Sequence, residues 1–173
     1  MWLPKLEFRM DVIQAVASFT TLATDGVTMA ANQLDNFATA ADRGRFVENQ
    51  TPANLRGNFP SIDHLEFIDN DTASISQVKS RDVASADALL ATITSDANAL
   101  YGAASIPLEG TDANGNFQSV TPDKVAVKSL NVYIPENHSG YLRSIASQLR
   151  QLAKNTESVI NVVPVRGWRG RSR

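Results

Sequence analysis

The sequence predicts an α+β domain: a long N-terminal amphipathic helix, two further helices and a small, mostly antiparallel sheet, with extended arms at both ends. Three observations lead to this class. Apolar residues recur every three to four positions in three separate stretches, which is the period of a helix. Short runs of alternating or β-branched residues lie between these stretches, as in strands. The 173 residues are 43 % hydrophobic and 20 % charged, the balance of an ordinary globular domain.

The long helix is expected over residues 10–41, with Asp11 as its cap and Gly44 as its stop. A helix of this length reaches about 48 Å, more than a chain of this size needs for its own core. We therefore expect its apolar stripe to pack against another subunit. Gly26 lies among poor helix formers, so the helix either continues or breaks there. The predicted oligomer interface consists of Val12, Val16, Phe19, Ala23, Val27, Ala30, Leu34 and Phe37.

The middle of the chain predicts a loop, a hairpin and a helix. Residues 46–60 are rich in Asn, Gln, Pro and Gly, which favours a loop or an arm. Residues 64–68 and 72–78 read as two strands joined by a turn at 69–71. The second helix follows Asp82 or Ser85 and ends near Gly102.

The second half predicts further strands and the third helix. Residues 112–116 carry the Asn-Gly signal of a tight turn. Strand residues follow at 125–127 and 130–134, with a bulge expected at 128–129 because the alternation changes phase there. The third helix is expected from Gly140 to about Val159, and residues 162–165 form a last extended piece. Residues 1–165 would then be one domain, with 166–173 as a basic arm.

Little in the sequence points to catalysis. The absence of cysteine excludes disulfides, thiolate metal sites and a cysteine nucleophile. His64 stands beside Asp63 and Glu66, but no second histidine lies at a metal-ligand spacing, and His138 reads as part of a helix cap. Residues 112–123 resemble the start of a calcium loop only in part, so a hairpin turn is the better interpretation. We expect no catalytic, cofactor or metal residues.

The basic C-terminal arm is the one charge feature that stands out. It contains four arginines in eight residues, with no acidic residue after Glu157. Arginine with an interleaved tryptophan suits a phosphate backbone, and it equally suits an acidic groove on a protein neighbour; a free, solvated tail is the third alternative. Removing the arm is expected to leave the fold intact. The residues concerned are Arg166, Trp168, Arg169, Arg171 and Arg173.

These features together favour a non-enzymatic structural subunit of a large symmetric assembly. Our first expectation is a bacteriophage-type virion protein of the capsid, tail or connector, assembled in the host cytoplasm from copies of itself and other subunits. One alternative is a subunit of a cellular filament or secretion apparatus, in the cytoplasm or at the cell surface. A second alternative is a small enzyme with an unrecognised site. No stretch approaches the roughly 18 apolar residues of a membrane span.

Overall fold

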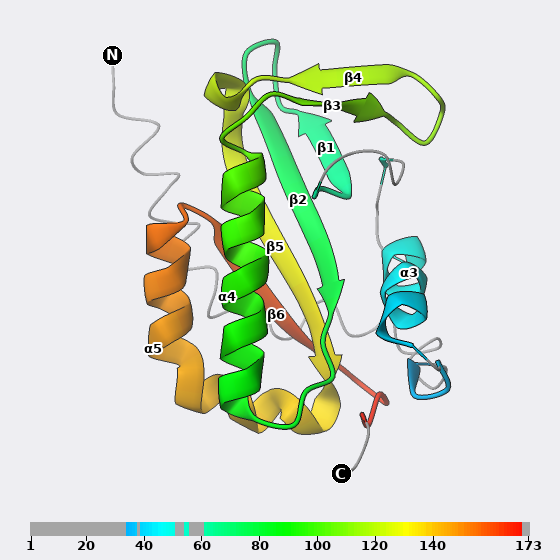
Figure 1. Ribbon diagram of the computed structural model, residues 1–173, viewed down its shortest axis with the longest axis vertical. Coiled ribbons are helices and arrows are strands. Elements are labelled where there is room, and N and C mark those ends of the chain that lie inside the picture. Colours follow the sequence, from blue (N-terminus) through cyan, green and yellow to red (C-terminus); the bar gives the residue numbers. More distant parts are fainter. Residues whose placement is uncertain (1–33, 38, 51–53, 56–60, 171–173) are drawn as a thin grey trace.

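A computed structural model describes residues 34–37, 39–50, 54–55 and 61–170. A four-stranded sheet lies at the centre, with two long helices side by side in front of it and a third beside β2 (Figure 1). The predicted α+β class is confirmed. The elements are α3 (Ala40–Gln50), β1 (His64–Phe67), β2 (Ala73–Ser80), α4 (Ala86–Ala103), β3 (Leu108–Thr111), β4 (Phe117–Val120), η2 (Pro122–Lys124), β5 (Val125–Pro135), η3 (Glu136–His138), α5 (Ser139–Asn155) and β6 (Val159–Val165).

The main sheet has the strand order β1-β2-β5-β6. β1 pairs with β2 antiparallel, whereas β2 with β5 and β5 with β6 pair in parallel. The predicted mostly antiparallel sheet is therefore wrong, because α4 and α5 are the crossover helices that parallel neighbours require. β3 and β4 form a separate antiparallel hairpin. Ala73 faces Val125 and Ser74 faces Val127, so the bulge in β5 lies at Ala126, just before the predicted position.

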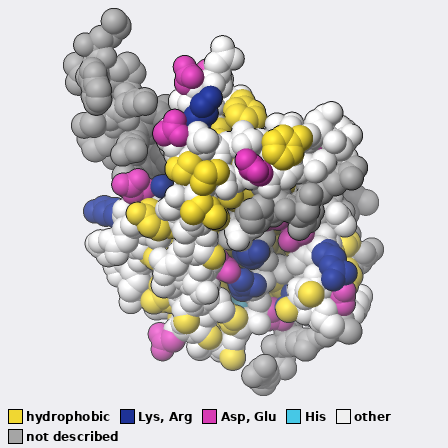
Figure 2. Space-filling view, turned by 45° about the horizontal axis from the view of Figure 1, so that its top comes forward, with side chains coloured by type: hydrophobic (Ala, Val, Ile, Leu, Met, Phe, Trp, Pro, Cys, Tyr) yellow, Lys and Arg dark blue, Asp and Glu magenta, His cyan; other side chains and the backbone are white. Residues whose placement is uncertain are grey.

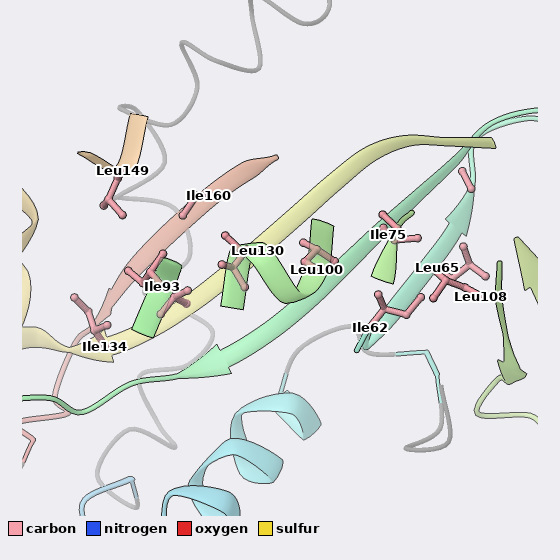
Figure 3. Close-up of a cluster of buried hydrophobic side chains, with 14 of the residues drawn as sticks. Ile62, Leu65, Ile75, Ile93, Leu100, Leu108, Leu130, Ile134, Leu149 and Ile160 are labelled. Atoms are coloured by element: carbon pink, nitrogen blue, oxygen red, sulfur yellow. The ribbon is translucent and has the colours of Figure 1, made fainter. Parts of the chain in front are cut away.

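The larger core lies between the sheet and the helices α4 and α5. Ser85 begins α4 by accepting a hydrogen bond from the Ala88 amide at 3.1 Å, as its sequence predicts. Figure 3 shows Ile93 and Leu100 of α4 lying over the sheet beside the strand residue Leu130, and all three are fully buried. Each such side chain contributes about 1.5–3 kcal/mol of burial free energy.

A second, smaller core lies beneath the opposite face of β2. Residues 75 and 78 fall on opposite faces of a strand, and Val78 accordingly joins this other cluster. Trp168 is fully buried at its centre, with the Arg43 guanidinium 5.5 Å from its ring centroid. The cluster consists of Leu34, Val47, Val78, Val165 and Trp168.

The described part of the basic arm, residues 166–170, folds back onto the chain instead of extending away. The amide of Glu136 donates to the carbonyl of Trp168 at 2.8 Å, and the amide of Arg169 donates to the Asp35 carboxylate at 3.2 Å. Gly167 and Gly170 have φ values of +87° and +70°, which favour glycine and turn the backbone back.

The predicted long helix is corrected where the structure describes it. Residues 10–33 lie outside the described residues. Leu34 is helical, but residues 35–37 and 39 are not, and α3 begins anew at Ala40. The Asp42 amide donates to the Thr39 hydroxyl at 3.1 Å, so Thr39 starts a separate helix. Gly44 lies inside α3 and does not end a helix, and α3 occupies part of the predicted 46–60 loop.

Candidate functional site

Asp63 lies where β1 leaves the edge of β2. The last paired residues are His64 and Ser76, and the Asp63 amide donates to the Ser76 carbonyl at 2.9 Å. One of the Asp63 carboxylate oxygens then accepts a hydrogen bond from the Val78 amide at 2.7 Å. The carboxylate thus takes the place of a strand partner, which fixes it beside the neighbouring residues of β2.

Gln77 and Lys79 flank this contact on β2. They are two residues apart, so they share one face of the strand. Gln77 is only 4 % exposed, and its Oε1 accepts no hydrogen bond among the described residues. A buried acceptor without a partner costs about 1–3 kcal/mol. Such an atom calls for an explanation, and a bound ion or water molecule is a common one.

Glu48 joins the group from α3, near the C-terminal end of that helix. Burial raises the pKa of Glu48, and the negative charge of Asp63 raises that pKa further, whereas Lys79 and Arg45 lower it. The Asp63 carboxylate and the Lys79 ammonium group therefore each lie close enough to act on Glu48. Two carboxylates held together in a half-buried position repel each other unless a cation or a proton lies between them. We call Glu48, Asp63, Gln77 and Lys79 the carboxylate–lysine site.

The chemistry of this site suits a hard divalent cation and a phosphate group. Mg²⁺ binds through one or two carboxylates, keeps several water molecules and shares its remaining positions with substrate phosphates. Among the described residues, no three His, Cys, Asp or Glu side chains gather as a metal cage would need. The carboxylate–lysine site has two carboxylates, and its ammonium group adds positive charge for a phosphate oxygen.

Sequence reasoning missed three of these four residues. Glu48 fell in the predicted loop, and Lys79 lies just beyond the predicted end of its strand. Gln77 was recognised only as a strand residue. A signal was available: polar residues at 77 and 79 follow Ala73 and Ile75 on what is otherwise the buried face of β2. Asp63 was noted only for its closeness to His64.

Each of the two histidines lies near a carboxylate. His64 Nε2 lies 3.9 Å from a Glu66 carboxylate oxygen, on the rim of the sheet. His138 is buried and stacks on Tyr141, with ring centroids 5.0 Å apart. Burial lowers the pKa of His138, and the nearby Asp82 carboxylate partly opposes that shift.

The hairpin turn predicted at 112–116 is confirmed. The Asp112 carboxylate accepts hydrogen bonds from the amides of Asn114 and Asn116 at 2.9 and 2.8 Å. These bonds lower the pKa of Asp112, and the bond from the Asn116 amide has the largest effect. The carboxylate therefore stabilises the turn.

The two predicted interface residues that the structure describes, Leu34 and Phe37, both belong to the smaller core of their own chain. Leu34 is fully buried within its own chain, and Phe37 packs on Phe46 with ring centroids 5.0 Å apart. Trp168 is likewise buried in its own chain, whereas Arg166 and Arg169 are exposed. Residues 12–30, Arg171 and Arg173 lie outside the described residues. No helix among the described residues is long and apolar enough to span a membrane.

Large apolar side chains are exposed at the end of the sheet that carries the β3–β4 hairpin. The β1–β2 turn, the C-terminal end of α4 and the hairpin all reach this end (Figure 1). Figure 2 shows hydrophobic side chains gathered over the upper part of the forward face. Their exposed fractions range from 44 to 68 %. The residues are Phe67, Ile68, Tyr101, Ile106 and Phe117.

Comparison with known proteins finds a similar fold in a solved structure. No family model and no curated protein matches the sequence. A chain of the CdiA-CT/CdiI toxin and immunity complex from Yersinia pseudotuberculosis superimposes with a TM-score of 0.50 and 16 % identity. The match covers 71 % of this chain and 98 % of that chain, and at this identity it shows the fold alone. That chain is a toxin or immunity protein and not a virion subunit, so the predicted bacteriophage-type virion protein is wrong.

Proposed function

We propose that this protein is the toxin-type member of a toxin–immunity pair and that it hydrolyses phosphodiester bonds at the carboxylate–lysine site. The observation that carries the proposal is that the charges of Asp63 and Lys79 both act on the half-buried carboxyl group of Glu48. Gln77, which precedes the Val78 amide that binds Asp63, adds a buried amide oxygen without a partner among the described residues. The likeness to a chain of a toxin and immunity complex supports it.

Each residue of the site has a distinct role. A divalent cation held there would polarise the phosphate and lower the pKa of a bound water molecule. Asp63 and Glu48 would supply the carboxylate oxygens for that cation, and Gln77 Oε1 would accept a hydrogen bond from a water molecule bound there. Lys79 places its ammonium group against a non-bridging phosphate oxygen, where negative charge grows during the reaction. The water oxygen bonds to phosphorus, the bond from phosphorus to the ester oxygen breaks, and that oxygen leaves with a proton as an alcohol.

The test is cleavage of plasmid DNA and of a long RNA by the purified chain, with Mg²⁺ or Mn²⁺ and with a chelator. We expect cleavage that requires the cation and that falls by about a hundredfold or more in Asp63→Asn and Lys79→Met. The matched controls are Asp71→Asn and Lys154→Met, which change exposed residues away from the site and should cleave as the wild type does. Cleavage that survives in Asp63→Asn, or that ignores the chelator, contradicts the proposal.

A second candidate is the non-enzymatic member of such a pair, a protein that acts by binding its partner. The exposed apolar end of the sheet favours it, because exposed apolar patches on a monomer commonly mark interaction sites. Induced expression in bacteria separates the two candidates. Growth arrest that Asp63→Asn relieves supports the hydrolase. Normal growth, with no cleavage of either nucleic acid, supports the binding protein.

A further inference from the structure

Asn54 closes the outer edge of β1. β1 is an edge strand of the main sheet, and its outward-facing amides and carbonyls need partners. The Asn54 side chain donates from Nδ2 to the Leu65 carbonyl at 2.6 Å, and its Oδ1 accepts from the Leu65 amide at 2.9 Å. One side-chain amide therefore replaces a strand neighbour at this position.

The main chain of Asn54 holds Asp63. The amides of Asn54 and Leu55 both donate to the Asp63 carbonyl, at 3.1 and 3.2 Å. On its other side, Asp63 is bound to the Ser76 carbonyl and the Val78 amide of β2. Asp63 is thus held from two sides, and on one of them its partners among the described residues are the amides of Asn54 and Leu55.

The same residue contacts the β3–β4 hairpin. The Ala113 amide donates to the Asn54 carbonyl at 2.8 Å, and Leu55 forms an antiparallel bridge with Asp112. Asp112 in turn shapes the hairpin turn through its carboxylate. An unbroken series of hydrogen bonds therefore runs from the hairpin turn through Asn54 to Asp63.

We propose that Asn54 is a positioning residue that holds Asp63 in the carboxylate–lysine site and couples the position of the β3–β4 hairpin to it. The inference rests on the proposed function for its catalytic consequence, but its geometry is independent of that function. A molecule that moves the hairpin changes the position of the Asp63 carboxylate and with it the affinity of the site for its cation. Through this coupling, a partner that binds the exposed apolar end of the sheet would change the position of the Asp63 carboxylate without covering the carboxylate–lysine site.

The test uses two variants and one control in the full chain. Asn54→Ala removes both side-chain bonds to Leu65 and keeps the main-chain bonds to Asp63, so it tests whether anchoring residue 54 to β1 is what fixes Asp63. Ala113→Pro removes only the amide that donates to Asn54. The Gly115 amide donates to the Asp112 carbonyl and closes a four-residue turn in which residue 113 is the second residue. The second position of such a turn tolerates proline. Asn98→Ala changes an exposed asparagine of α4 and is the matched control.

Two measurements distinguish positioning from general stability. The first is the Mg²⁺ concentration that gives half-maximal cleavage, expected to rise about tenfold in Asn54→Ala and less in Ala113→Pro. The second is hydrogen exchange of the Val78 amide by NMR, which reports the bond to Asp63 directly. We expect this amide to exchange about tenfold faster in Asn54→Ala while the Leu130 amide in the centre of the sheet keeps its wild-type rate.

The outcomes separate this inference from the proposed function. If the wild type cleaves and Asn54→Ala retains its Mg²⁺ dependence and its Val78 exchange rate, Asn54 does not position Asp63. If Ala113→Pro leaves both measurements unchanged while Asn54→Ala alters them, the coupling to the hairpin is refuted. If the wild type cleaves nothing, the proposed hydrolase fails, and the exchange rate of Val78 alone decides whether Asn54 holds Asp63.

Discussion

Replacing Trp168 tests the finding that the C-terminal segment belongs to the core. The side chain is fully buried, and a buried tryptophan replaced by alanine costs about 3–5 kcal/mol. The stacked Arg43 guanidinium adds about 0.5–1 kcal/mol. At about 2–4 °C of melting temperature per kcal/mol for a chain of this size, Trp168→Ala should lower Tm by about 7–24 °C.

Thermal and urea unfolding followed by circular dichroism measure this change. Arg169→Ala is the control, because that side chain is exposed and surface substitutions change stability by about 0.5 kcal/mol or less. Trp168→Phe keeps most of the ring volume and should fall between the two. If Trp168→Ala melted within about 2 °C of Arg169→Ala, the smaller core would not depend on Trp168. The sequence alone had led us to expect that losing residues 166–173 would leave the fold intact.

Three further predictions follow from other contacts. Burial, and then a neighbouring carboxylate, raise the pKa of Glu48 above its value in the unfolded chain. At a pH above the raised pKa, the charged carboxylate therefore destabilises the folded state, and this destabilisation disappears as the pH falls through the raised pKa. Glu48→Gln should therefore raise Tm in neutral, cation-free buffer while abolishing cleavage, and a lower Tm would refute this reasoning. Asp96→Ala leaves the half-buried Arg81 without its bidentate partner and should cost about 3 kcal/mol in urea unfolding. Gly170→Ala places a methyl group 2.8 Å from the Pro135 ring at a φ of +70°, and thermal melting should show a loss of about 1–3 kcal/mol.

The elements that the sequence predicted well are those set by neighbouring residues. Ser85 before a helical stripe located α4, and the Asn-Gly turn located the β3–β4 hairpin. Strand pairing was harder, because β2 and β5 meet across an intervening helix and hairpin. The helical spacing of apolar residues continues from Leu34 to Ala41, although one helix ends and another begins between them. Spacing alone does not reveal that Thr39 caps a new helix.

The candidate site was hidden for the same reason. Its residues come from α3, the start of β1 and the end of β2, and only the folded chain brings them together. In the sequence, Asp63 stands next to His64, whereas in the fold its carboxylate binds the amide of Val78. An aspartate that accepts a hydrogen bond from an edge amide fifteen residues away has no local sequence signature.

The membership of Trp168 in the smaller core affects the order of events during synthesis. Trp168 and Leu34 share this core, and it also holds Val47 on α3, the helix that presents Glu48. Lys79, the last residue of the site to be synthesised, precedes Trp168 by 89 residues. At translation speeds of roughly 5–20 residues per second, this interval takes roughly 4–18 seconds. During that time α3 lacks the side chain that completes its packing, so a nascent chain that already contains all four residues of the carboxylate–lysine site cannot yet hold them in place.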